Sequence, residues 1–284
     1  RHAAKTGDRR TLTYAQARAK APEIDWSAYT PVTPAQPGIT ELRDYPLTEL
    51  REYIDWTPFF STWEYKGRYP DILHNPAQGE SARKLFEDAQ VMLDQLTAEG
   101  WLTANGIIGL FPANAIGDDI EVYADSSRTE LRTRLHHLRQ QGQHRAGVPN
   151  KSLADFVAPK ESGVADWMGG FAVTGGLGAT EHIMKFKAEL DDYSAILLEA
   201  LADRLAEAFA ERLHQRVRTE FWGYANSETF SNDDLIAERY RGIRPAPGYP
   251  ACPDHTEKQI LWELLDVHTR TGIELTDGMA MWPG

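Results

Sequence analysis

The segment 244–255 constrains the fold of this chain more than any other stretch. Its sequence, RPAPGYPACPDH, carries four prolines and a glycine in twelve residues. Each proline fixes φ at about −65°, removes a backbone donor and disfavours helix in the residue before it. The segment is therefore an extended or turning loop, and the N–H groups of Ala246, Gly248, Tyr249 and Ala251 are predicted to lack ladder partners. Such a rigid loop is either a ligand-binding element or a surface connector.

Composition narrows the class of protein. The chain has 284 residues, of which 42% are hydrophobic, enough to bury the core of one large domain or two smaller ones. A net charge of −12 argues against nucleic acid, whose binding needs cations for the phosphates. No apolar window reaches the ~18–20 residues of a membrane span, and residues 1–10 do not resemble a secretory signal. The single cysteine, Cys252, excludes an internal disulfide. We expect a cytoplasmic protein without a membrane or nucleic-acid partner.

The N-terminal part differs in composition from the rest. Residues 1–40 are polar and contain four prolines, which predicts a linker or N-terminal arm, whereas 41–284 is the globular domain. Two stretches are densely basic, 1–10 and 128–145. We interpret them as a solvated arm and a solvated helix face, although a basic patch is also suited to an acidic protein partner.

Hydrophobic periodicity predicts the main elements. Helices are expected at 79–96, 131–143, 193–222 and 256–270, with short helices within 11–21 and 47–54, the second broken by the DWTPFF run at 55–60. Strands are expected at 106–112, 119–124, 153–158 and 167–174, with a turn at 113–117 and the start of a strand within 274–281. The glycines of 167–174 indicate close backbone approach. This order lacks strict βαβ alternation, so we predict an α+β fold: a twisted, largely antiparallel sheet flanked by helices, one of them long.

Three motifs are more consistent with structure than with chemistry. Gly175 to Gly178 does not have dinucleotide-loop spacing and is interpreted as a turn. On the expected helix, His136, His137 and His144 are too far apart in angle or distance to chelate one zinc ion. Cys252 has no clear activating neighbour. We therefore predict no catalytic residue and no metal ligand.

Charged residues at three separate places form the best candidate site. Arg204 and Glu207 share a face of the long helix and are explained either as an intrahelical ion pair or as part of a site. With Asp55 and Arg244, Glu207 is suited to a zwitterionic ligand, with carboxylates for an ammonium or sulfonium and a guanidinium for a carboxylate. The sequence does not establish that these residues converge.

Several motifs resemble one known family. The run RPAPGYPACPDHTEK from Arg244, DWTPFF at 55–60, GLFPAN at 109–114, LADFVAPK at 153–160, TGGL at 174–177 and ADRLAEAFAE at 202–211 are similar to the S-adenosylmethionine-binding activation domain of cobalamin-dependent methionine synthase. The resemblance extends from about Leu50 to the last residue. It implies that Asp55, Arg244 and Ala246 bind S-adenosylmethionine, with Gly248, Tyr249 and Glu207 as further members of the site.

The resemblance also implies a function. Such a domain supports reductive remethylation of oxidised cob(II)alamin, which restores the enzyme for methionine biosynthesis. Its implied partners are the cobalamin-binding domain of the same polypeptide and flavodoxin or a flavoprotein reductase, while zinc and folate sites belong to other domains. Relative to the family pattern, the chain is expected to lack a C-terminal segment. A stand-alone methyltransferase and a non-catalytic docking module remain as alternatives.

Overall fold

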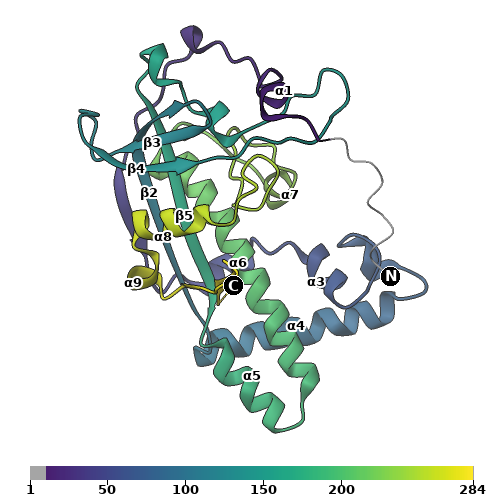
Figure 1. Cartoon of the computed structure of the whole chain (residues 1–284). Coiled ribbons are helices and arrows are strands. Elements are labelled where there is room, and N and C mark those ends of the chain that lie inside the picture. Colours follow the sequence, from purple (N-terminus) through teal and green to yellow (C-terminus); the bar gives the residue numbers. More distant parts are fainter. Residues whose placement is uncertain (1–10, 284) are drawn as a thin grey trace.

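The computed structural model describes residues 11–283, and its centre is an antiparallel sheet (Figure 1). The central strand β2 pairs with β5 along one edge and with β1 and then β3 along the other, and β4 extends the sheet beyond β3. A separate hairpin joins β6 to β7. This topology confirms the predicted α+β fold with a largely antiparallel sheet. The strands are β1 Gly38–Leu42, β2 Thr103–Ile116, β3 Asp119–Tyr123, β4 Leu131–His136, β5 Asp166–Leu177, β6 Glu274–Leu275 and β7 Met281–Trp282.

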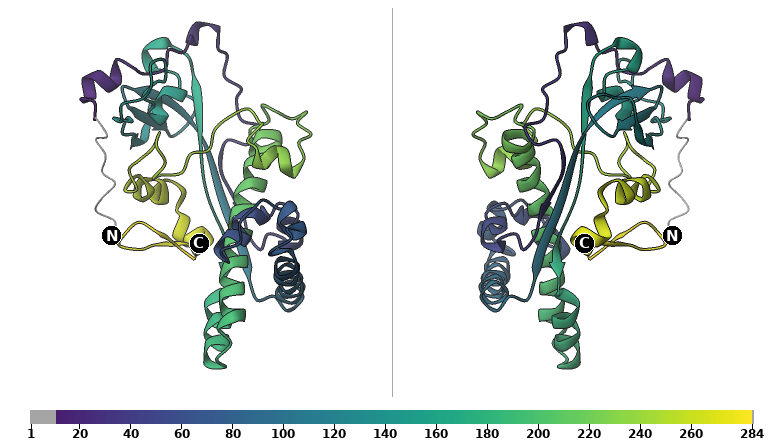
Figure 2. Two further views of the ribbon diagram at one scale, coloured as in Figure 1. Left: turned by 90° about the vertical axis from the view of Figure 1, so that its right-hand side faces the viewer. Right: turned by 90° about the vertical axis from the view of Figure 1, so that its left-hand side faces the viewer.

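Helices cover both faces of the sheet. Figure 2 shows α4 and α6 on one side, and α8 and α9 on the other. The longest helix, α6, packs against β5 and continues into a π-helical turn, Val217–Phe221. The helix and this turn together confirm the predicted long helix. The helices are α1 Tyr14–Arg18, α2 Leu47–Arg51, α3 Trp56–Thr62, α4 Gly79–Glu99, α5 Ala179–Ala188, α6 Asp192–Arg216, α7 Asn232–Ile236, α8 Glu257–Leu265 and α9 Val267–Thr271.

Two hydrophobic clusters lie on opposite faces of the sheet, because alternate residues of a strand point to opposite sides. Ala104, Ile108 and Leu110 of β2 belong to the cluster that includes α4 and α6. Ile107 and Phe111, with Ala113 and Ala115, belong to the cluster that includes α8 and α9. The strand β2 is thus shared by both cores.

Glycines of β5 allow the flanking helices to approach closely, but the close approach of backbone predicted within 167–174 is found at Gly175. A Cβ on Gly170 would lie 2.7 Å from the Leu261 side chain, and one on Gly175 would lie 2.9 Å from the backbone nitrogen of Ala206 in α6. The interpretation of 175–178 as a turn needs correction. Gly175 is still within β5, and Gly178, with φ of 94°, is the N-cap of α5.

The strand β2 is longer than predicted. It does not end at Pro112, and 113–117 is not a turn, since pairing continues to Ile116. Pro112 is tolerated because the partner on that edge changes there: the ladder with β1 ends at Leu110 and the ladder with β3 begins at Ala113.

Three further predictions were wrong. Residues 131–143 are not a helix: 131–136 form β4, in which Leu135 is buried opposite Ile120. Residues 153–158 are not a strand, because Ser152 and Asp155 form a capping box that starts a 3-10 helix, Leu153–Phe156. The basic stretch 128–145 is also no solvated helix face, since several of its arginines bind within the domain. Arg128, Arg132 and Arg139 donate to backbone carbonyls, and Arg134 pairs with Glu121.

The DWTPFF run forms a helix and not only a break. Asp55 is the N-cap of α3, and Pro58 lies in the first turn, where its missing N–H needs no intrahelical acceptor. The preceding helix α2 agrees with the short helix expected at 47–54. The helix expected at 256–270 is divided into α8 and α9 by Asp266, which has φ of 52°.

The described part of the N-terminal region lies against the domain. Leu12 N–H donates to Gln141 O at 2.7 Å, and Ala17 of α1 is fully buried. Further along, Gln36 N–H donates to Phe221 O at 2.8 Å. The basic stretch 1–10 lies outside the described residues. No helix within residues 11–283 has the length and apolar character needed to cross a membrane.

Candidate functional site

The proline-rich segment passes from the α6 side of the sheet to the α8 side (Figure 2). Between its ends it forms a tight turn, in which Tyr249 N–H donates to Ala246 O at 3.1 Å and Gly248 N–H donates to Cys252 O at 2.7 Å. These two N–H groups, which were predicted to lack ladder partners, are therefore bonded within the turn itself. Ala246 N–H, in contrast, has no hydrogen-bond partner among residues 11–283. Gly248 has φ of 106°, and a Cβ there would meet the ring of His255, so the turn requires glycine.

Arg244, at the start of the segment, is held by a buried carboxylate of α6. Its Nη2 donates to Glu211 Oε2 at 2.6 Å, and the two side chains are 24% and 10% exposed. Burial raises the pKa of Glu211, and the charge of Arg244 limits that rise. Burial disfavours the charged form of Arg244, but the charge of Glu211 and the Tyr240 hydroxyl together outweigh burial and raise the pKa of Arg244. Arg244 Nε and Glu211 Oε1 are buried without a hydrogen-bond partner.

A second ion pair lies deeper on the same face of α6 and its continuation. Arg218 donates to both oxygens of Glu228, at 2.9 and 2.6 Å, and the side chains are 0% and 4% exposed. Arg218 Nη1 also donates to His214 Nδ1 at 2.8 Å, and its guanidinium lies 3.9 Å from the ring centroid of Tyr240. Burial and the charge of Arg218 lower the pKa of His214 to about 3, so this imidazole is neutral at pH 7. Two arginines and two glutamates balance their charges here.

The remaining predicted site residues, Asp55 and Glu207, are carried by α3 and α6. Asp55 is half-buried, and its Oδ1 accepts from Thr57 N–H at 2.9 Å as the cap of α3, which packs against α6. Glu207 is exposed on α6. Among the described residues, no hydrogen bond or ion pair joins Asp55, Glu207 and Arg244 to one another, and none joins Arg204 to Glu207.

Glu211, the carboxylate in contact with Arg244, was not among the predicted site residues. It lies one turn after Glu207 and is buried between Ala208 and Leu213 of the apolar face. A charged residue at an inward position of a helix was the available signal, because unpaired charges are rarely buried.

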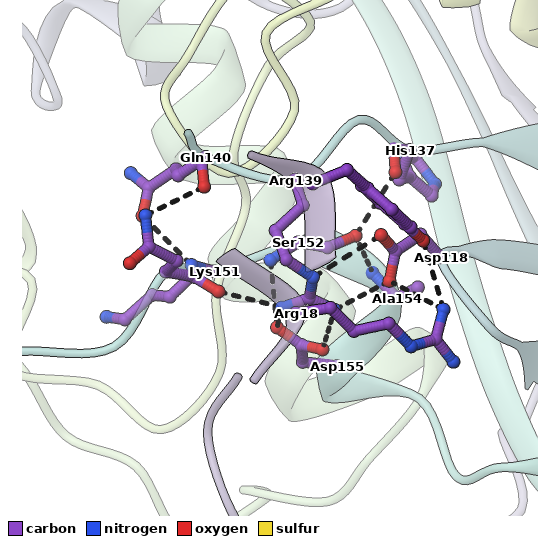
Figure 3. A network of polar contacts seen from close by, with 11 residues as sticks. Arg18, Asp118, His137, Arg139, Gln140, Lys151, Ser152, Ala154 and Asp155 are labelled. Carbon is purple, nitrogen blue, oxygen red and sulfur yellow. Dashed lines mark hydrogen bonds and ion pairs between the residues drawn. The ribbon is translucent and has the colours of Figure 1, made fainter. Parts of the chain in front are cut away.

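The other end of the segment is anchored by a polar network (Figure 3). The buried Arg139 donates to Asp118 at 2.7 Å, to Asp155 at 2.6 Å and to Asn150 O at 2.7 Å. Asp155 in turn caps the 3-10 helix whose Leu153 N–H donates to Ala251 O at 2.8 Å. The network thus fixes the position of the 3-10 helix to which the proline-rich segment is hydrogen-bonded.

The remaining candidates are structural. Cys252 is buried, its Sγ lies 3.5 Å from His137 Nδ1, and burial raises the pKa of its thiol to about 11, consistent with the small loop residue predicted. His136 ends β4 and His137 follows it, so the helical spacing assumed for these histidines does not apply. Within residues 11–283, no cluster of three or more His, Cys, Asp or Glu is placed to hold a metal ion.

A surface hollow of about 370 Å³ lies on the other flank of the segment. It is lined by Leu138 to Gly142, His144, Pro250 and Pro253, and its lining is mostly apolar. Neither Asp55 nor Arg244 lines it, so the charged site is a separate feature of the surface.

Known proteins are similar to this chain in sequence and in fold. The family model described as "Vitamin B12 dependent methionine synthase, activation domain" matches residues 46–284. A solved structure described as the MetH reactivation domain bound to AdoHcy is similar, with 54% sequence identity and a TM-score of 0.93. The similarity covers 96% of this chain and 84% of the other. The chain therefore belongs to the family of vitamin B12 dependent methionine synthase activation domains.

Proposed function

We propose that this chain binds S-adenosylmethionine at Arg244 and supports reactivation of the cobalamin cofactor of methionine synthase, a methyltransferase. The observation that carries the proposal is Arg244, held by Glu211 beside the unpartnered N–H of Ala246. The related reactivation domain bound to AdoHcy, which is S-adenosylmethionine without its transferable methyl group, supports the choice of ligand.

The residues present fit this ligand. The Arg244 guanidinium, whose buried Nε has no hydrogen-bond partner, and the unpartnered N–H of Ala246 two residues later are suited to the oxygens of a carboxylate. Asp55 offers a second carboxylate oxygen to the ammonium or sulfonium, because only its Oδ1 is used in capping α3. We include Gly248, which shapes the turn, and Tyr249, which is 62% exposed, as contacts of the ligand, with Glu207 at the border.

The bound ligand supplies a methyl group on a sulfonium, which needs no general base to leave. The task of this chain is therefore to bind and orient. We propose that residues 41–284 act as one domain joined through 1–40 to a cobalamin-binding domain. Flavodoxin or a flavoprotein reductase in the cytoplasm would provide the electron.

Calorimetric titration with S-adenosylmethionine tests the proposal. Arg244→Ala is expected to weaken binding by about 1.5–3 kcal/mol, the scale of a hydrogen bond to a charged group. Asp55→Asn is expected to weaken it too, while keeping the cap of α3, because asparagine caps helices as well as aspartate does.

Each variant has a matched control. Arg239→Ala removes an exposed arginine five residues before Arg244, and Asp25→Asn changes the cap of another helix. Both controls should bind as the unchanged chain does. Loss of less than about 0.5 kcal/mol in Arg244→Ala would mean that the ligand carboxylate is held elsewhere.

A further inference from the structure

We propose that Glu211 is a positioning residue, which holds the Arg244 guanidinium in the orientation that receives the ligand carboxylate. This inference rests on the proposed function and adds a residue to it. The ion pair uses one nitrogen of Arg244, with Nη2 2.6 Å from Glu211 Oε2, and leaves Nε without a protein partner. One edge of the guanidinium is therefore fixed while donor capacity remains for a ligand.

The position of Glu211 is itself fixed by its surroundings. It is 7% exposed on α6, and His214 and Arg218 follow it three and seven residues later, on the same face of α6 and its continuation. Tyr240, four residues before Arg244, lies on the Arg218 guanidinium, and its ring is 4.9 Å from that of His214. Both the helix that carries Glu211 and the chain leading to Arg244 are thus held by the Arg218–Glu228 pair.

The difference in exposure indicates what happens without Glu211. Arg244 is the member of the pair that reaches the surface, so without Glu211 its guanidinium keeps only the interaction with Tyr240 and would turn toward water, losing its single orientation. A ligand carboxylate would then have to reorder it. Only a ligand that carries this carboxylate would be affected.

Calorimetry with two ligands measures this selectivity. S-adenosylmethionine carries the carboxylate, and decarboxylated S-adenosylmethionine keeps the sulfonium and ammonium but lacks it. Glu211→Leu is expected to weaken S-adenosylmethionine binding about tenfold or more, and binding of the decarboxylated ligand less than about twofold. Glu211→Gln keeps an acceptor oxygen in place and should restore affinity to within about threefold. Glu220→Leu, which removes an exposed carboxylate paired with Arg216 at 2.9 Å, is the matched control.

If Glu211→Leu weakens the binding of both ligands equally, Glu211 has only a structural role and the inference is overturned. Unchanged or tighter binding of S-adenosylmethionine would also overturn it. If Glu211→Leu does not fold, Glu211→Asp provides the test. It keeps the negative charge, but its side chain is one methylene shorter, so the guanidinium is displaced from its original position. It should show the same ligand-selective loss. An unchanged chain that binds both ligands equally would instead refute the carboxylate role of Arg244, and with it the proposed site.

Discussion

Replacing Arg218 with methionine is expected to lower the free energy of unfolding by about 3–5 kcal/mol, the cost of leaving a buried charge without its partner. Arg218 is fully buried, and the 4% exposed Glu228 receives both of its hydrogen bonds from it. Methionine fills much of the same volume, so loss of charge pairing dominates over loss of packing. His214 Nδ1 also loses its donor.

The companion change, Glu228→Leu, should lower the free energy of unfolding by a similar amount, because it leaves the buried guanidinium of Arg218 without its partner. The double variant removes both charges, and replacing a buried pair by apolar groups is often neutral or stabilising. We therefore expect the double variant to lose less stability than the sum of the two single losses, by more than about 2 kcal/mol, because residues in direct contact are energetically coupled.

Urea denaturation, followed by tryptophan fluorescence and circular dichroism, gives the three free energies. The chain has 8 tryptophans, one of which, Trp222, lies four residues beyond Arg218. Single costs below about 1 kcal/mol would refute the reasoning, since that is the range of solvent-exposed ion pairs. Additive costs would show that Arg218 and Glu228 act independently.

Two other predictions concern stability. Gly175→Ala places a Cβ against the backbone of α6 and should destabilise the domain by about 1–3 kcal/mol in the same assay, whereas Gly142→Ala, with open space around it, should be tolerated. His214 is a base whose pKa falls to about 3 on folding, so below pH 6.5 the unfolded state binds more protons and stability decreases as the pH falls. Denaturation of His214→Gln between pH 6.5 and 5 should show a pH slope smaller by up to about 1.4 kcal/mol per unit; an unchanged slope would contradict the buried neutral state.

Local pattern predicted the two longest helices well, but it missed α3, α5 and α7 and predicted some strands poorly. The periodicity of 79–96 and 193–222 was sufficient for α4 and α6, because a helix is stabilised by neighbours in sequence. In 131–143, Leu131, Leu135 and Leu138 have helical spacing, but the segment pairs with β3. Strand pairing depends on a partner elsewhere in the chain, so this outcome is not contained in the segment itself.

Only part of the candidate site could be predicted from local sequence, because its residues come from distant parts of the chain. Arg244 was singled out because it begins the proline-rich segment, and Asp55 because it begins the DWTPFF motif, whose helix α3 was not predicted. The partner of Arg244 lies 33 residues earlier, on a helix that also offers Glu207. Choosing between the two glutamates requires knowing which face of α6 is turned toward the 224–244 segment, and that is set by packing.

The shared strand β2 has a consequence for how the domain unfolds. Its side chains belong alternately to the two hydrophobic clusters. Neither cluster can therefore lose its contacts with β2 while the other keeps all of its own. The two halves should therefore lose structure in a single cooperative transition. Hydrogen exchange would show it as a common, slowest rate for the amides of Ile107 and Ile108, which face opposite cores from adjacent positions.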